Sequence, residues 1–428
     1  MTPEVKKRID QIRNGIVPEG YKKGKLGIVP GEWDEIPFST LFTSTSDYTD
    51  NLHQYPLYSL TIEDGITAKT ERYERSHLVK KDNSYKVVRP NDYAYNPMNI
   101  RFGAVARHKG DIPVAVSGYY DIFTTVHKSD LVFMDSFLTC GPMITYYNKV
   151  STGSLIEKQR VHFSDFLEFS LALPPLEERK KIAEILTTQD KAIELERQRI
   201  DEILKVKQFF LGKMFPKKGQ AVPEIRFKGF TGVWEQRKLS EMCGTFEYGL
   251  NAAAKEFDGK NKYIRITDID DASREFLLSD LSSPDICLDG MSKYLLSSGD
   301  IVFARTGASV GKTYIYREND GIVYFAGFLI RAKVNQDNDA EFVFQSTLSP
   351  SYEKYIRITS QRSGQPGVNA QEYSEYDLFA PSKEEQQRIG HFLRGIDNLI
   401  TLHQRKLEEE KKKKKALMQL LLTGIVRV

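Results

Sequence analysis

The feature that most constrains the fold is an internal repeat with a period near 207 residues. Residues 171–215 align without a gap on residues 378–422, and at least 11 of these 45 positions are identical. Unrelated sequences of ordinary composition would share about three such positions. A period this long means that whole domains are duplicated, not the short units of a solenoid. The identical pairs include Pro174 with Pro381, Asp190 with Asp397, and Lys207 with Lys414.

Both copies carry the pattern of a long coiled-coil helix. The seam positions alternate in steps of three and four over four heptads, which is typical of a coiled coil and not of a helix on a globular surface. Forty residues of helix extend about 60 Å. In the first copy the seam positions are Ile182, Leu186, Gln189, Ile193, Glu196, Ile200, Ile203, Lys207, Phe210 and Met214. In the second copy they are Ile389, Leu393, Ile396, Ile400, His403, Leu407, Glu410, Lys414, Leu417 and Leu421.

Two globular segments, 31–170 and 220–377, separate the helical regions. Short β-branched and aromatic runs alternate there with turn residues, which predicts mixed sheets with a few short helices. Residues 92–103 align on residues 300–311, so we interpret the two segments as diverged copies that keep a frame and vary the loops.

The repeat divides the chain into five parts. They are an arm at 1–30, a globular domain at 31–170, a helical region at 171–219, a second globular domain at 220–377 and a second helical region at 378–428. The arm and the C-terminus share a Gly-Ile-Val sequence, at 15–17 and 424–426. We therefore expect the two ends of the chain to pack together.

The composition favours a cytoplasmic protein without a membrane span. Apolar residues make up 40% and charged residues 28% of the 428 residues, no apolar run approaches 18 residues, and the N-terminus lacks the apolar core of a secretory signal. Three cysteines, Cys140, Cys243 and Cys287, lie far apart, as expected in a reducing compartment. The net charge of +3 permits a basic surface facing DNA but does not establish one.

Possible catalytic motifs are incomplete. The glycines of Gly307–Thr313 enclose three residues, whereas a phosphate-binding loop needs four. The sequence Asn96-Pro97-Met98-Asn99 resembles the catalytic motif of amino-methyltransferases but lacks its second proline and its aromatic residue. Pro284-Asp285 is not followed by the Glu-x-Lys of a nuclease metal site, and the seven histidines are scattered. We predict no catalytic residue, no metal and no cofactor.

The chain resembles the specificity subunits of Type I restriction–modification systems. The resemblance covers nearly the whole chain, with one departure at Ser382-Lys383, where the first copy has Pro175-Leu176. The residues that carry it are ALPPLEERKKIAEIL (172–186), APSKEEQQRIGHFL (380–393), GFTGVWEQRKLSEM (229–242), YIRITDID (263–270), GDIVFARTGASVGKTYIY (299–316), SGQPGVNA (363–370) and YNPMNIRFGAVA (95–106).

This resemblance implies a DNA-reading protein that is not itself an enzyme. Its fold would be α+β, with two similar target-recognition domains separated by two long antiparallel coiled-coil helices. Each domain would read one half of a bipartite site in double-stranded DNA, and the stiff helices would set the gap between the halves. Two modification subunits and motor-nuclease restriction subunits would supply methyl transfer, ATP use and cleavage. The rival interpretation is a coiled-coil scaffold that assembles partners without binding DNA, but it leaves the duplicated, loop-varied domains unexplained.

Residue chemistry selects candidate DNA contacts. Arginine can bond guanine and asparagine can bond adenine in a bidentate manner, while cations, hydroxyls and small residues suit phosphates. In the second domain the candidates are Arg305, Thr306, Ser309, Lys312, Arg265, Arg362, Gln365 and Asn369, with Thr267 beside Arg265. In the first domain they are Asn96, Asn99, Arg101 and Arg107.

The helical regions supply two further expectations. Exposed positions on the first helix, Glu184, Lys191, Glu194 and Arg197, are the expected contacts for the modification subunits. If the helices pair antiparallel, their centres meet near Glu196 and His403, so these two polar seam residues are expected to interact and to fix the register.

Overall fold

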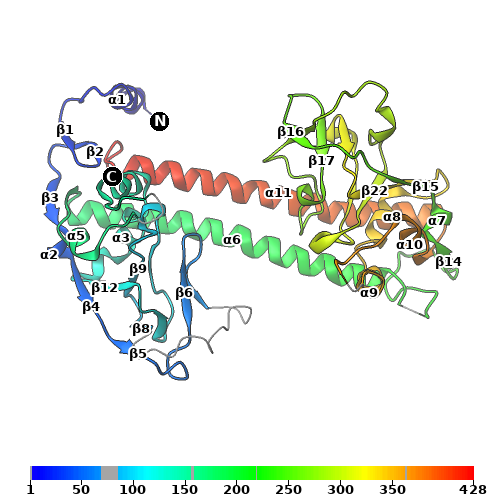
Figure 1. Ribbon diagram of the computed structural model, residues 1–428, viewed down its shortest axis with the longest axis horizontal. Coiled ribbons are helices and arrows are strands. Elements are labelled where there is room, and N and C mark those ends of the chain that lie inside the picture. Colours follow the sequence, from blue (N-terminus) through cyan, green and yellow to red (C-terminus); the bar gives the residue numbers. More distant parts are fainter. Residues whose placement is uncertain (1, 69–84, 156–158, 218, 362–363) are drawn as a thin grey trace. The chain divides into compact units, whose positions relative to one another are not determined.

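The computed structural model describes residues 2–68, 85–155, 159–217, 219–361 and 364–428, and they form two compact units. Unit 1 consists of Met1–Glu194 and Glu408–Val428, and unit 2 consists of Leu195–Leu407. Both boundaries fall inside 39-residue helices, α6 (Leu176–Met214) and α11 (Lys383–Leu421). Each unit therefore contains one part of each long helix together with its own globular part (Figure 1).

Unit 1 is mixed α/β. Its helices, besides its share of α6 and α11, are α1 (Pro3–Arg13), α2 (Phe38–Leu41), α3 (Leu131–Phe137), α4 (Gly141–Val150) and α5 (Phe163–Leu167). Its strands are β1 (Tyr21–Gly24), β2 (Gly27–Pro30), β3 (Asp34–Pro37), β4 (Phe42–Thr45), β5 (Tyr48–Thr49), β6 (Tyr58–Thr61), β7 (Gly65–Ala68), β8 (Tyr85–Val88), β9 (Tyr93–Tyr95), β10 (Val105–Arg107), β11 (Val114–Ser117), β12 (Asp121–Thr125) and β13 (Ser170–Leu173).

Unit 2 has the same character. Its shorter helices are α7 (Leu239–Met242), α8 (Ala340–Ser346), α9 (Pro350–Thr359) and α10 (Ala370–Ser374). Its strands are β14 (Glu235–Lys238), β15 (Cys243–Tyr248), β16 (Ala254–Glu256), β17 (Lys262–Ile264), β18 (Ser282–Pro284), β19 (Asp300–Ala304), β20 (Thr313–Ile315), β21 (Val323–Phe325), β22 (Leu329–Val334) and β23 (Asp377–Ala380).

The duplication is visible in the sheet topology. The central antiparallel sheet of unit 1 has the order β10-β9-β12-β4, and that of unit 2 has the corresponding order β20-β19-β22-β15. In each unit the strand before the long helix also pairs with the first strand of the globular part, β13 with β3 and β23 with β14. The predicted fold of two similar mixed domains is confirmed.

The predicted coiled-coil seam is confirmed as well. All twenty seam positions are buried or half-buried, whereas most positions between them are exposed. In unit 2, Glu196 contacts His403 and Lys207 contacts Asp397. The residue number in α11 therefore decreases as the residue number in α6 increases. The helices of this unit are therefore antiparallel. Unit 1 shows the same direction, because Ile182 shares a core with Leu421 and Leu422, whereas Gln189, later in α6, bonds Glu410, earlier in α11.

One glutamate in the first turn of each long helix, Glu178 in α6 and Glu385 in α11, is a buried partner of the globular part. The indole Nε1 of Trp33 donates to Glu178 at 3.2 Å, and Arg427 also binds this carboxylate. In unit 2, the Arg226 guanidinium binds Glu385 at 2.6 and 2.7 Å. Glu178 and Glu385 are equivalent positions of the repeat, and in each unit this glutamate binds the long helix to the globular part.

Both ends of the chain contribute to unit 1. The Arg8 guanidinium donates to the carbonyl of Ile425 at 2.9 Å, and the Tyr21 hydroxyl donates to the carbonyl of Gly424 at 2.8 Å. Gly424 has a φ of +70°, and a Cβ there would meet the ring of Pro30 at 2.4 Å, so this position requires glycine.

The two tryptophans of the chain provide one spectroscopic reporter for each unit. Trp33 lies in unit 1 and Trp234 in unit 2, and both are buried. The Nε1 of Trp234 has no hydrogen-bond partner among the described residues, so replacing this tryptophan removes no such bond. In a Trp33→Phe background fluorescence follows unit 2, and in a Trp234→Phe background it follows unit 1.

The expected contact between Glu196 and His403 is confirmed. Nδ1 of His403 lies 2.6 Å from Oε2 of Glu196, and Arg199 binds the other carboxylate oxygen at 2.8 Å. The hydrogen bond with His403 lowers the pKa of Glu196, and the nearby charges of Arg199 and Lys406 act in the same direction. The seam therefore contains a charge-assisted polar contact at this point.

We predict that this contact makes a measurable contribution to the stability of unit 2. A double-mutant cycle with Glu196→Gln and His403→Gln should give a coupling free energy of about 0.5–1 kcal/mol at neutral pH. Since the pKa of Glu196 is lowered in the folded state, its contribution is complete above the unfolded carboxyl pKa of about 4.3 and disappears as pH falls through the folded pKa. Urea unfolding, followed by Trp234 fluorescence, should show the wild-type and Glu196→Gln stabilities converging in acid. Coupling indistinguishable from zero would contradict the register role.

Candidate DNA interface

The candidate interface of unit 2 is centred on Arg305, directly after β19. Its guanidinium carbon lies 5.1 Å from the ring centroid of Tyr248 and 5.7 Å from that of Phe328, over both rings. The two rings are 45% and 57% exposed. Nε of Arg305 is buried and has no hydrogen-bond partner among the described residues. The side chain is thus held by ring faces and not by an acid.

A groove of about 620 Å³ brings three sequence-predicted residues together. Arg305, Arg265 and Thr267 all line it, together with Tyr248 and Phe328. The Arg265 guanidinium binds both oxygens of Asp268, at 2.8 and 2.9 Å, and this pairing raises the pKa of Arg265. Arg305 and Arg265 therefore differ: the first has an unused donor edge, whereas the second is already paired.

The predicted loop after α9 packs beside the Arg305 segment. Thr306 forms a β-bridge with Gly367, and the amide of Gly307 donates to the carbonyl of Pro366 at 3.0 Å. Gln365 is exposed, and its amide nitrogen lies close to Gly307. The Asn369 side chain accepts from the amide of Glu372 at 2.9 Å and caps α10, so it has a structural role there. Arg362 lies outside the described residues.

Lys312 is turned away from this groove. Its ammonium group binds Asp271 at 2.6 Å, and its side chain is 15% exposed. Lys312 lines a different hollow, which contains part of α6. Ser309 ends the short 3₁₀ turn Gly307–Ser309 and is half-buried. The structure therefore separates Lys312 from Arg305, although the two residues are close in sequence.

In unit 1, Arg101 also lies over an exposed ring, but unlike Arg305 it is itself buried. Its guanidinium carbon lies 5.0 Å from the ring centroid of Phe102, which is 52% exposed. Nη1 of Arg101 donates to the side-chain oxygen of Gln159, and its buried Nε has no partner among the described residues. Asn99 is exposed, whereas the buried Asn96 side chain accepts from the amides of Met98 and Asn99 and shapes the turn.

Arg107 is fully engaged within unit 1. Its Nε and Nη2 bind Asp135 at 2.9 and 2.8 Å, and its Nη1 donates to Asn91 at 2.6 Å. The hydrogen bond to Asp135 raises the pKa of Arg107. This arginine joins β10 to α3, so a DNA contact by it would need to break an existing pair.

Sequence reasoning missed the aromatic residues of the site. Tyr248 lies at the end of β15 and Phe328 precedes β22, both distant in sequence from Arg305. Only Phe102, the neighbour of Arg101, could have been noticed from the sequence. Aromatic rings usually lie in the core, so a sequence gives no direct sign that these rings are exposed.

The candidate docking positions on α6 are exposed in both units. Glu184, Lys191 and Glu194 belong to unit 1, and Arg197 belongs to unit 2. All four lie outside the buried seam, as the heptad pattern predicts.

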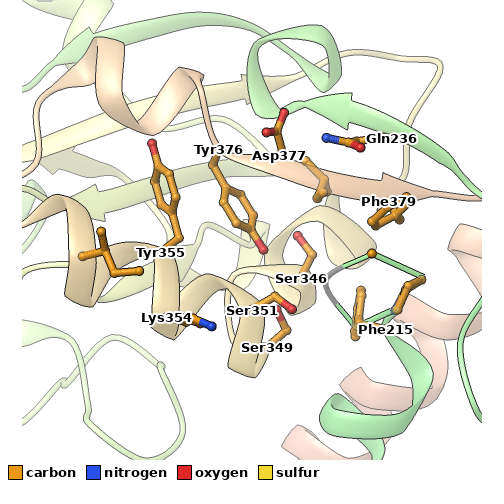
Figure 2. Close-up of a pocket in the computed structure, with 14 residues that line it drawn as sticks. Phe215, Gln236, Ser346, Ser349, Ser351, Lys354, Tyr355, Tyr376, Asp377 and Phe379 are labelled. Atoms are coloured by element: carbon orange, nitrogen blue, oxygen red, sulfur yellow. The ribbon is translucent and has the colours of Figure 1, made fainter. Parts of the chain in front are cut away.

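A separate cleft of about 470 Å³ in unit 2 contains none of the candidate DNA contacts (Figure 2). It lies between α9 and the β14–β23 pair, and its walls include Tyr355, Tyr376, Phe379 and Phe215. Ser349 at its edge caps α9 by accepting from the amide of Tyr352 at 3.3 Å. Its lining is mainly apolar, which does not suit a DNA backbone.

The described residues offer neither a metal-binding cluster nor a membrane-spanning helix. In the described part of the chain no group of three or more His, Cys, Asp or Glu side chains is arranged to hold a metal ion. None of the described helices combines the length and apolar character that a membrane crossing needs.

Comparison with known proteins identifies the family. The sequence model of the Type I restriction modification DNA specificity domain matches residues 136–205 and 232–411, more than half of the chain. The chain belongs to this family. It is 28% identical over 274 residues to the Type I restriction enzyme MjaVIII specificity subunit of Methanocaldococcus jannaschii, a match covering 61% of this chain and 63% of that protein. It is 22% identical over 436 residues to the putative type I restriction enzyme MjaX specificity subunit of the same organism, covering 99% and 93%.

Solved structures agree on the fold. A chain from a structure concerned with complex assembly and conformational transition of a type I R-M system matches with a TM-score of 0.52 and 15% identity, covering 93% of this chain and 99% of that one. The type I restriction–modification S subunit from M. genitalium matches with a TM-score of 0.50 and 14% identity, covering 91% and 96%. Both likenesses concern the fold alone.

Proposed function

We propose that this protein is the DNA specificity subunit of a Type I restriction–modification complex. The domains at 31–170 and 220–377 each read one half of a bipartite site in double-stranded DNA, and the long helices set the gap between the halves. The observation that carries this proposal is that both units of a chain of the specificity family repeat one antiparallel sheet. Beside the sheet of unit 2, Arg305 lies in a groove over two exposed aromatic rings. An arginine in such a position suits base reading in a groove of DNA.

Catalysis belongs to other chains in this proposal. Two modification subunits dock on the helical regions through Glu184, Lys191, Glu194 and Arg197 and carry out methyl transfer. Restriction subunits add ATP use and cleavage, and the complex acts in the cytoplasm. The polar, exposed character of these four helix positions supports a docking role, because interface rims are polar.

The rival proposal is a scaffold that assembles partners without reading DNA. It predicts that the sequences of the globular domains have no influence on which DNA is modified. The specificity proposal predicts the opposite, with one domain responsible for each half-site.

We predict that exchanging one domain changes one half of the methylated sequence. The chain is expressed with its modification subunit in cells lacking other methyltransferases, and the methylome is sequenced. A bipartite motif should appear, and replacing residues 31–170 with the equivalent domain of another family member should alter one half while the gap and the other half stay unchanged.

The matched control is the reciprocal exchange of residues 220–377, which should alter only the other half. Simultaneous change of both halves, or a wild-type pair that methylates no defined sequence, would overturn the proposal.

A further inference from the structure

Arg305 differs from the other described arginines that have a buried, unpaired side-chain nitrogen. Arg101, Arg179, Arg317 and Arg331 also have a buried nitrogen without a hydrogen-bond partner, but each has another hydrogen bond or ion pair. Among these described arginines, Arg305 alone has neither, and only the rings of Tyr248 and Phe328 contact its charge. Arg305 lines the groove, and its Nη groups form no hydrogen bond or ion pair with the described residues. A guanidinium whose donors are unsatisfied is costly, so these groups point to a partner outside the protein.

The backbone holds Arg305 in a fixed position. Its amide donates to the carbonyl of Phe328 at 3.1 Å, and its carbonyl accepts from the amide of Val368 at 2.9 Å. The residue is thus fastened on one side to the start of β22 and on the other to the segment before α10. A guanidinium that stacks on ring faces leaves the N–H groups of its edge available for hydrogen bonds in its own plane.

The surroundings of Arg305 favour a base edge over a phosphate. A phosphate site usually offers several donors, including free backbone amides. Here the amides of Arg305 and Gly307 already donate to Phe328 and Pro366. The other cation that lines the groove, Arg265, is bound to both carboxylate oxygens of Asp268. The planar guanidinium edge of Arg305, with its parallel N–H donors, therefore lies beside the two exposed rings of Tyr248 and Phe328. Such an edge suits a flat partner that presents two neighbouring acceptors.

We propose that Arg305 reads a guanine in the half-site bound by unit 2, donating two parallel hydrogen bonds to O6 and N7 of that base. This inference rests on the proposed function and extends it to one residue and one base. Guanine presents these two acceptors side by side in the major groove, and arginine matches them in a bidentate manner. Tyr248 and Phe328 are positioning residues that hold the guanidinium plane.

The test uses the complex of this chain with its modification subunit and the methylated motif of the wild type. The half assigned to residues 220–377 should contain at least one guanine. Arg305→Lys keeps the charge but loses the fork, so it should make that single position degenerate while the other half and the gap stay unchanged. Arg305→Ala should behave in the same way, and affinity for the cognate duplex should fall about 5- to 150-fold. The matched control is Lys293→Ala, which removes another cation that lies over a tyrosine ring in unit 2 but outside the groove.

Base analogues test the hydrogen bonds directly. Replacing the guanine by 7-deazaguanine removes N7 and should weaken wild-type binding but not binding by Arg305→Ala, whereas inosine keeps O6 and N7 and should be tolerated by both. Uniform weakening on every sequence, with a salt slope reduced by about one, would identify a phosphate contact and overturn the inference. An unchanged motif in both variants, or a half-site without guanine, would also overturn it. Failure of the proposed function itself is distinct, because the wild type would then show no bipartite motif at all.

Discussion

Replacing Lys207 with methionine is expected to lower the free energy of unfolding of unit 2 by about 3–5 kcal/mol. The Lys207 ammonium lies 2.5 Å from the carboxylate of Asp397, and the two side chains are only 5% and 2% exposed. Removing one member of a buried ion pair leaves the other charge without its partner in a medium that solvates it poorly. Methionine keeps an unbranched, apolar side chain almost as long as that of lysine, so the loss comes mainly from the charge.

The neighbours of Asp397 make this loss larger than for an isolated pair. Gln345 on α8 donates to Asp397 at 2.6 Å and to Glu341 at 3.1 Å, and Arg317 then joins Glu341 to Glu275. The network contains three acids and two cations, Lys207 and Arg317. Without Lys207, one cation faces three acids. Burial already raises the pKa of Glu341 and of Glu275, which indicates that the charged forms are disfavoured there.

The internal repeat supplies a matched control for Lys207. Lys414 and Asp190 occupy the equivalent positions of the other copy and form an ion pair at 2.5 Å in unit 1, but their side chains are 27% and 50% exposed. Lys414→Met should therefore cost at most about 1 kcal/mol. Urea unfolding with Trp234 as the single tryptophan measures the Lys207 variant, and Trp33 measures the Lys414 variant.

A second variant separates loss of the ion pair from general damage to the fold. Lys207→Met combined with Asp397→Asn removes the remaining charge and keeps an acceptor for Gln345, so it should recover most of the lost stability. If Lys207→Met cost no more than Lys414→Met, burial would not control the strength of this pair. If the double variant were as unstable as the single one, the uncompensated charge would not be the cause.

The long helices could be predicted from the sequence because the spacing of their apolar residues also decides which residues are buried. A residue every third or fourth position faces the partner helix whatever surrounds it, so Ile182 and Ile389 could be placed in the seam without a structure. The roles of Glu178 and Glu385 could not be predicted in this way. Both are acids of a first helical turn, a position that is usually exposed, but they are buried against Trp33 and Arg226. Such contacts depend on chain segments far away in sequence.

In the candidate DNA site, too, the sequence predicts the types of residue but not the contacts that they make. Residue chemistry selected Arg305, Lys312 and Arg107 for one reason, their capacity to bind bases or phosphates. The structure distinguishes them because Lys312 is paired with Asp271 and Arg107 with Asp135, whereas Arg305 has no acidic partner among the described residues. A single sequence does not show which residues of different elements pair with each other. Arg305 could therefore be distinguished from Lys312 and Arg107 only from the fold.

The largest effect in unit 1 is expected from Phe166, at the centre of an aromatic cluster. Its ring is fully buried on α5, with neighbouring ring centroids 5.0–5.7 Å away. The neighbours are Phe38, Phe42, Tyr95, Phe123, Phe163 and Phe169. Phe166→Ala removes the ring and leaves a cavity that a rigid set of rings fills poorly, so unit 1 should lose about 3–5 kcal/mol of stability.

The measurement compares the two tryptophan reporters in urea. With Trp33 as the single tryptophan, the unfolding midpoint of the Phe166→Ala variant should fall sharply, because Trp33 and Phe166 belong to the same unit. The control of the same residue type is Phe209→Ala, since the Phe209 ring on α6 is 53% exposed and its removal should change the stability of unit 2 by less than about 1 kcal/mol. A loss below 1 kcal/mol for Phe166→Ala would mean that the cluster closes around the missing ring. Since Tyr95 ends β9 directly before the turn that carries Asn96, Asn99 and Arg101, such repacking would also displace the candidate DNA contacts of unit 1.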